Sequence, residues 1–168
     1  MKYHIWTEGC QMNVADSLRV ASALEHLGYQ PTRSAEEANV IVLNTCVVRQ
    51  SAEDKAYGRL HSLRPLKAGR PDMVINLMGC LVGVKGYEHL KKRFPFVDVF
   101  SPPSDPGPLV AYLTQDETRS LQIAETELRH AFMDDDLRLP LDERGKLVAT
   151  HVPVVLGCSH ACTFCIIP

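Results

Sequence analysis

Three cysteines close together near residue 160 form the strongest chemical pattern in the sequence. Cys158, Cys162 and Cys165 follow the spacing C-x3-C-x2-C, directly after a run of residues that we expect to form a strand. Iron–sulfur clusters are held by cysteine thiolates, and four of them would close a [4Fe–4S] cluster. Three thiols therefore suit a cluster with one open iron, which can chelate S-adenosylmethionine and deliver an electron to its sulfonium. A zinc knuckle is the alternative, although zinc prefers four ligands in paired C-x2-C form.

The other three cysteines are far apart in the sequence but share a structural position. Cys10, Cys46 and Cys80 each come just after an expected strand, and Gly9 and Gly79 precede two of them. The carboxyl ends of parallel strands meet at one edge of a sheet, where ligands bind in open α/β folds. Glycine allows close backbone approach at such a point. The pattern predicts three thiols that converge, and three separately buried free cysteines are the alternative.

Strand and helix signals alternate through the first hundred residues and predict the elements that position these cysteines. We expect strands at 3–6, 40–43, 73–78 and 97–100, and helices at 51–66, 87–94 and 109–113. Another helix is expected to begin with Asn13 as its N-cap and to end at Gly28. Its apolar side would consist of Val14, Leu18, Ala21, Leu24 and Leu27. The predicted fold class is α/β, with βαβ units and a parallel sheet.

A breaker cluster at 101–106 and a charged, poorly patterned stretch after it divide the chain. We expect an N-terminal α/β domain over residues 1–117, a linker over 118–146, and the start of a second domain over 147–168. This start would consist of a strand at 149–156, where Pro153 favours an edge position, and the cysteine loop. A lone strand cannot fold by itself, so we expect this second domain to be truncated.

The composition is that of an ordinary globular protein of the cytoplasm. Hydrophobic residues make up 45% and charged residues 23%, with a net charge of −2. No apolar run approaches the roughly 20 residues that span a bilayer, and the early polar residues exclude a signal peptide. Thiols of the cytoplasm stay reduced, so the six cysteines point to metal binding or catalysis rather than to disulfides.

Five basic residues with no acidic residue between them lie on, or just after, the helix expected at 51–66. They are Lys55, Arg59, Arg64, Lys67 and Arg70. A basic helical face can contact nucleic-acid phosphates. A solvated helix face is the simpler interpretation of the same pattern.

Four motifs in combination resemble the methylthiotransferase family of radical S-adenosylmethionine enzymes. The motifs are Gly9-Cys10-Gln11-Met12-Asn13, Asn44-Thr45-Cys46-Val47-Val48-Arg49, Gly79-Cys80, and Gly157-Cys158 through Pro168. The Gln11-Met12 pair favours the subgroup of tRNA-2-methylthio-N6-dimethylallyladenosine synthases. The resemblance implies an N-terminal α/β methylthiotransferase domain, a central partial (β/α) barrel and a C-terminal RNA-binding domain. Only the first of these would be complete here.

The resemblance also implies cofactors and residue roles. An auxiliary [4Fe–4S] cluster would be ligated by Cys10, Cys46 and Cys80. A second [4Fe–4S] cluster, which binds S-adenosylmethionine, would be ligated by Cys158, Cys162 and Cys165. The implied reaction adds a methylthio group to carbon 2 of N6-isopentenyladenosine at tRNA position 37. That carbon has no acidic proton, so acid–base catalysis offers no route. A radical that removes its hydrogen, together with a stored sulfur, would provide one.

The implied partners are the anticodon loop of a tRNA and a reductant that donates electrons, with no membrane and with a monomeric chain. Most of the S-adenosylmethionine pocket would lie in the missing barrel, so we expect the fragment alone to be inactive. The segments Leu81-Val82-Gly83 and Ser159-His160-Ala161 depart from the family pattern. Neither segment changes a ligand position.

Two kinds of alternative function remain open on the sequence. Other members of the family modify threonylcarbamoyl-adenosine in tRNA or an aspartate of a ribosomal protein. A non-catalytic iron–sulfur or zinc-binding module belongs to a different class, and zinc without acid-labile sulfide would distinguish it from the enzyme.

Overall fold

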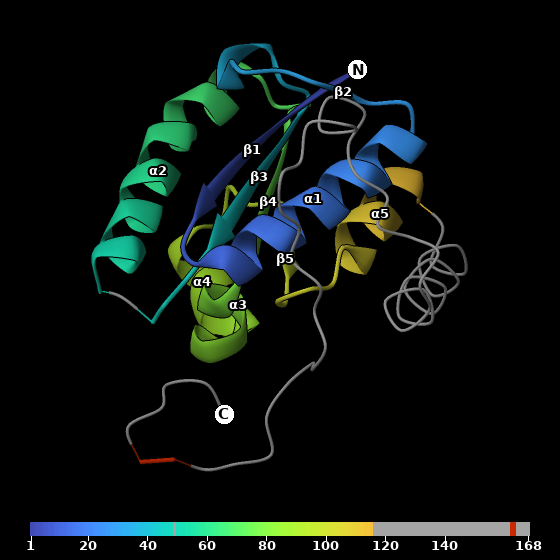
Figure 1. The fold of residues 1–168 in the computed structure, drawn as a ribbon. Coiled ribbons are helices and arrows are strands. Elements are labelled where there is room, and N and C mark those ends of the chain that lie inside the picture. The colour runs from blue at the N-terminus through green and yellow to red at the C-terminus, as the bar shows by residue number, and fades with distance from the viewer. Residues whose placement is uncertain (49, 116–161, 164–168) are drawn as a thin grey trace, which may run out of the picture.

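The structure is a computed structural model that describes residues 1–48, 50–115 and 162–163. Five parallel strands form one sheet in the order β2-β1-β3-β4-β5 (Figure 1). The strands are β1 (Lys2–Glu8), β2 (Gln30–Pro31), β3 (Val40–Thr45), β4 (Val74–Gly79) and β5 (Val99–Ser101). The predicted α/β class with a parallel sheet is confirmed.

Helices cover both faces of this sheet. They are α1 (Gln11–His26), α2 (Gln50–Gly69), α3 (Cys80–Lys85), α4 (Tyr87–Arg93) and α5 (Gly107–Thr114), with a short 3₁₀ turn η1 (Ala35–Glu37). Helices α1 and α5 lie on one face and α2 on the other, while α3 and α4 lie near the carboxyl ends of the strands (Figure 1). None of the helices in the described ranges is both long and apolar enough to cross a membrane.

Two apolar clusters hold the layers together, one on each face. The cluster under α2 and α4 contains Ile41, Leu43, Leu60, Leu63, Ile75, Leu77, Leu90 and Phe94, all of them buried. The cluster under α1 and α5 contains Tyr3, Val20, Leu24, Val40, Val42, Met78, Val99 and Leu109. Alternate residues of β3 enter opposite clusters, as the two-residue period of a strand requires. Both faces of this strand are buried, which explains its continuous apolar run.

Helix α1 differs from the expectation in its start and in its buried side. It begins at Gln11 with Cys10 as the N-cap, so Asn13 is the third helical residue and not the cap. Val14, expected in the core, is 45% exposed. The buried side runs through Asn13, Asp16, Ser17, Val20, Ala21, Ala23 and Leu24. The first half of this buried side is therefore polar. The spacing of apolar residues could not predict it, because hydrogen bonds and not apolar contacts hold it in place.

Three elements were not expected from the sequence: β2, α3 and the 3₁₀ turn η1. Strand β2 has only two residues, one of them proline, and pairs with Lys2 and Tyr3 of β1. Helix α3 has six residues, including β-branched ones and Gly83, and carries no amphipathic pattern. The other elements appear where they were predicted, with ends that move by one to three residues, as helix and strand ends commonly do. The expected linker at 118–146 and the strand at 149–156 lie outside the described residues.

Candidate metal centre

Three cysteines lie at the carboxyl edge of the sheet, each after a different strand. Cys10 follows β1, Cys46 follows β3 and Cys80 follows β4. The three strands are neighbours, and the register aligns Glu8 with Thr45 and Thr45 with Gly79 at their last positions. The chain therefore delivers all three thiols to one edge, as predicted. Cys10 is exposed, Cys46 is buried and Cys80 is half-buried.

Two glycines allow the cysteine loops to pack together. A Cβ added to Gly9 would lie 2.6 Å from the Cys46 Cβ, closer than real side chains approach. Gly79 has a φ of +97°, a left-handed conformation that favours glycine, and its added Cβ would lie 2.7 Å from Asn44 Oδ1. The loop of Cys10 thus packs directly on Cys46, and the turn into Cys80 packs on the end of β3.

The electrostatics of Cys80 show that the thiols influence one another. Burial raises the pKa of the Cys80 thiol above its usual value, and the charges on Cys46, Cys10 and then Asp16 raise it further. Negative charge near the Cys80 thiol disfavours its ionisation. A bound cation reverses this preference, because it stabilises the thiolate form. Such a cluster of thiols therefore suits a cationic metal group.

Soft thiol donors at this edge suit zinc or an iron–sulfur group rather than a hard cation. Among residues 1–48, 50–115 and 162–163, no set of three or more His, Cys, Asp or Glu side chains converges as single-ion ligands do. Three cysteines after neighbouring strands provide the donor chemistry of an iron–sulfur site. The residues present therefore fit the implied auxiliary cluster.

Of the second set of cysteines, the structure describes only Cys162. Cys162 is exposed, and Cys158 and Cys165 lie outside the described residues. The assignment of these three cysteines to a cluster that binds S-adenosylmethionine accordingly stays a prediction from sequence.

The sequence did not predict that polar residues near the cysteines belong to the site. Asn13 and Asn44 are 2% and 0% exposed and lie next to Cys10 and Cys46 in the chain. Asn13 was expected as a helix cap and as part of a family motif, and Asn44 only as part of a motif. Two buried amides within three residues of candidate ligands were the available signal, because buried amides must find hydrogen-bond partners.

The basic residues of α2 do not form the free basic face that the sequence suggested. Arg59 lies over the Trp6 ring at 4.8 Å and pairs with Glu8 at 3.6 Å. Lys67 pairs with Asp98 at 2.8 Å, and the Arg70 guanidinium donates to the Glu36 carbonyl. The exposed side chains Lys55 and Arg64 remain as candidates for nucleic-acid contact.

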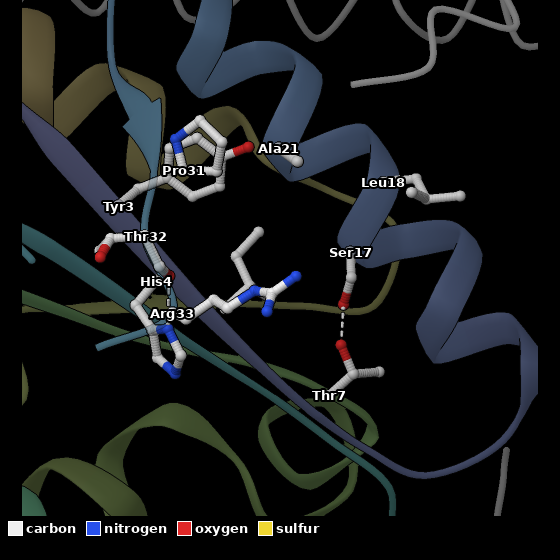
Figure 2. A pocket seen from close by; sticks show the side chains of 10 residues that line it. Tyr3, His4, Thr7, Ser17, Leu18, Ala21, Pro31, Thr32 and Arg33 are labelled. Atoms are coloured by element: carbon white, nitrogen blue, oxygen red, sulfur yellow. Dashed lines mark hydrogen bonds between the residues drawn. The ribbon is translucent and has the colours of Figure 1, made fainter. Parts of the chain in front are cut away.

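A pocket of about 510 Å³ lies along β1, beside α1 and the segment that follows β2 (Figure 2). Tyr3, Ile5 and Thr7 of β1 line it, together with Ser17 and Arg33 among others. Thr7 Oγ1 and Ser17 Oγ share a hydrogen bond of 2.7 Å at one side of it. Its lining includes none of the cysteines, so the structure gives it no part in the candidate metal centre.

Comparison with known proteins supports the resemblance seen in the motifs. Residues 2–101 match the family described as "Uncharacterized protein family UPF0004". A relative from Herpetosiphon aurantiacus named tRNA-2-methylthio-N(6)-dimethylallyladenosine synthase is 40% identical over 99% of this chain and 35% of its own length. Relatives with the same name from Roseiflexus sp. and Clostridium beijerinckii are 38% and 34% identical and are covered over 32% and 36% of their lengths.

The chain thus spans about a third of the length of the curated relatives it matches. The family match covers the whole five-stranded sheet and all three strand-end cysteines, from Cys10 to Cys80. The chain therefore belongs to the UPF0004 family and is similar to part of the tRNA-2-methylthio-N(6)-dimethylallyladenosine synthases.

Proposed function

We propose that this chain is part of a radical S-adenosylmethionine tRNA methylthiotransferase that acts on carbon 2 of N6-isopentenyladenosine at tRNA position 37. The gathering of Cys10, Cys46 and Cys80 at one sheet edge is the observation that carries the proposal. The names of the relatives support the tRNA substrate and the methylthio product. The same proposal includes a reductant as electron donor, a monomeric chain and a cytoplasmic location.

In this proposal, residues 1–117 form the domain that holds the auxiliary [4Fe–4S] cluster. The thiolates of Cys10, Cys46 and Cys80 would bind three of its irons. Residues 118–146 are the linker, and residues 147–168 begin the radical domain, where Cys158, Cys162 and Cys165 would bind the second cluster. When bound, the two clusters and S-adenosylmethionine supply the sulfur, the methyl group and the radical that carbon 2 requires.

The protein's own contribution is to hold and orient these groups. Parallel register places the three thiols at one level of the sheet edge. Burial of Cys46 protects one thiol from solvent, whereas exposed Cys10 leaves the site open on one side. An open side is required, because a tRNA base is far too large to enter a closed cluster site.

Two exposed apolar residues lie near the cysteines in the sequence, and in the proposed enzyme they would be covered during the reaction. Met12 and Val48 lie two residues from Cys10 and Cys46, and they are 44% and 61% exposed. The proposal assigns these two side chains to a surface that the tRNA or another domain covers. Exclusion of water there would protect a radical intermediate from side reactions.

Nucleoside analysis of tRNA tests the proposed substrate directly. The complete protein, loaded with iron and sulfide without oxygen, would be incubated with S-adenosylmethionine, a reductant and tRNA that carries N6-isopentenyladenosine. We expect the modified nucleoside to gain the mass of one methylthio group, and threonylcarbamoyl-adenosine in a parallel tRNA to remain unchanged. Modification of the threonylcarbamoyl nucleoside alone would move the enzyme to the other branch of the family.

A further inference from the structure

Two buried asparagines interlock directly beneath the cysteine loops. Asn13 comes from the first turn of α1, and Asn44 from the next-to-last position of β3. Asn13 Nδ2 donates to Asn44 Oδ1 at 3.0 Å, and Asn44 Nδ2 donates back to the Asn13 backbone carbonyl at 2.8 Å. The two side chains therefore fix the start of α1 to the end of β3.

The Asn13 side chain also forms hydrogen bonds with the backbone of the Cys10 loop and with the backbone just before Cys46. Its Oδ1 accepts a hydrogen bond from the Cys10 backbone N–H at 3.0 Å. Its Nδ2 donates to the carbonyl of Thr45 at 3.0 Å, and Thr45 is joined to Cys46 by that peptide group. One side chain thereby sets the separation between the two loops. In the thiol form, Cys10 Sγ also lies 3.4 Å from Asn13 Oδ1.

The third loop is tied to the same point of β3. Thr45 Oγ1 donates to the Met78 carbonyl at 2.7 Å, two residues before Cys80. Gly79 packs against Asn44 so closely that a Cβ there would lie 2.7 Å from Asn44 Oδ1. The turn into Cys80 is therefore positioned against Asn44 and Thr45.

Every polar atom of the two amide groups has a partner, so their orientation is unique. Asn44 Nδ2 donates to Ser17 Oγ at 3.0 Å in addition to the Asn13 carbonyl. Asn13 Oδ1 faces an N–H donor while its Nδ2 faces two oxygens. A satisfied buried network of this kind is rigid. An aspartate at either position would place an oxygen against an oxygen.

Asn76 provides a built-in comparison on the same sheet. It is fully buried, as Asn44 is. Its Oδ1 accepts from Ser101 Oγ at 3.1 Å, and its Nδ2 has no partner among the described residues. The hydrogen bond of Asn76 thus leads to β5 and away from the cysteine loops. Buried amides in this sheet therefore differ in whether they touch the cysteine site.

We propose that Asn13 and Asn44 are positioning residues that hold the loops of Cys10, Cys46 and Cys80 in their cluster-binding arrangement before iron arrives. The inference rests on the proposed function, because it assumes that these three thiols bind a cluster. Ligand loops without such support open locally and must be ordered on binding. Hydrogen bonds that hold the ligand residues in place before binding remove the free-energy cost of ordering the loops.

The first test measures loop order without metal. In the chain with Cys158, Cys162 and Cys165 changed to serine, the alkylation rate of buried Cys46 reports local opening of its loop. Asn13→Ala and Asn44→Ala should each raise this rate by about tenfold, because each removes several buried hydrogen bonds. Asn76→Ala should leave it within about twofold, and urea unfolding of each variant measures global stability.

The second test measures how well a bound cluster is held. In the same serine background, iron and sulfide are loaded without oxygen, and the rate of iron loss to a chelator is followed. Asn13→Ala and Asn44→Ala should lose iron about tenfold faster than the parent, and Asn76→Ala at the parent rate. If an alanine variant does not fold, Asn13→Asp replaces it, because it keeps the acceptor for the Cys10 N–H and loses the donor to Thr45.

The outcomes separate this inference from the proposed function. Faster alkylation and faster iron loss in the Asn13 and Asn44 variants alone support the positioning role. Equal rates in all variants, or rates that follow urea stability with Asn76→Ala included, overturn it. If the parent chain binds no iron, the proposed cluster fails, and the alkylation rates still decide whether the asparagines order the loops.

Discussion

Gly9 packs against Cys46 so closely that a Cβ on Gly9 would lie 2.6 Å from the Cys46 Cβ. The two residues belong to loops that follow different strands, 37 positions apart in the sequence. No side chain fits at Gly9 between these loops, so a glycine allows the Cys10 loop to pack against Cys46. The same close approach offers a way to separate them.

Gly9→Ala is predicted to weaken metal binding, because the added Cβ would clash with the Asn13 side chain and with Cys46 and would force the Cys10 loop away from both. Overpacking of this kind costs about 1–3 kcal/mol in stability, and we expect a reduced iron content after anaerobic loading. Gly58→Ala is the matched control, because a Cβ at Gly58 in α2 meets nothing within 4 Å. It should raise helix stability by about 0.5–1 kcal/mol and leave iron content unchanged. Equal iron loss in both variants would contradict the prediction.

Cys10→Ala and Cys162→Ala are predicted to separate two activities of the complete enzyme. The Cys10 variant should still cleave S-adenosylmethionine reductively and should transfer no methylthio group to tRNA. The Cys162 variant should lose the cleavage itself. Quantification of 5′-deoxyadenosine and of the modified nucleoside in one reaction measures both. If two folded variants lost cleavage equally, the division of work between the clusters would be wrong.

Lys67→Met is predicted to destabilise the fold without affecting the cysteines. Lys67 Nζ donates to both oxygens of Asp98 and to the carbonyls of Pro71 and Met73, which joins α2 to the starts of β4 and β5. Loss of the Lys67 ammonium leaves the largely buried Asp98 carboxylate without a cation, which should lower the free energy of unfolding by about 2 kcal/mol. A urea titration measures this loss. Lys55→Met, at an exposed position of the same helix, should stay within about 0.5 kcal/mol of the parent.

Charge reversal at Lys55 and Arg64 is predicted to weaken tRNA binding in a salt-dependent way. Both side chains are exposed on α2, whereas Arg59, Lys67 and Arg70 contact other parts of the protein. If the two side chains bind phosphates, the slope of log affinity against log salt should fall by about one unit for each phosphate that a variant no longer neutralises. An unchanged slope would assign this face of α2 to solvent.

Much of the architecture followed from patterns that depend on burial. The apolar run at 40–43 predicted a buried strand, and β3 is buried along its whole length, Val40–Thr45. Strand–helix alternation predicted a parallel sheet with three cysteines at one edge. The buried side of α1 was not predictable from apolar spacing, because Asn13 and Asp16 are buried through hydrogen bonds to Asn44 and Ser104. Polar burial depends on partners that are distant in the sequence.

Short elements and paired charges also escaped the sequence reasoning. Helix α3 begins at Cys80 because Gly79, at a φ of +97°, turns the chain at the end of β4. Its six residues are too few for a periodic pattern to emerge. The ion pair of Lys67 with Asp98 joins residues 31 positions apart. Part of the basic face that the sequence suggested therefore consists of side chains that form ion pairs and hydrogen bonds within the protein.

Counting iron and acid-labile sulfide on one defined variant tests the central claim most directly. The variant carries Cys158, Cys162 and Cys165 as serine, so only Cys10, Cys46 and Cys80 can bind a cluster. After anaerobic loading and gel filtration, we predict about four irons and four sulfides per chain, and loss of both when Cys46→Ser is added. Zinc without sulfide, or iron content unchanged by Cys46→Ser, would contradict a cluster held at the carboxyl edge of the sheet.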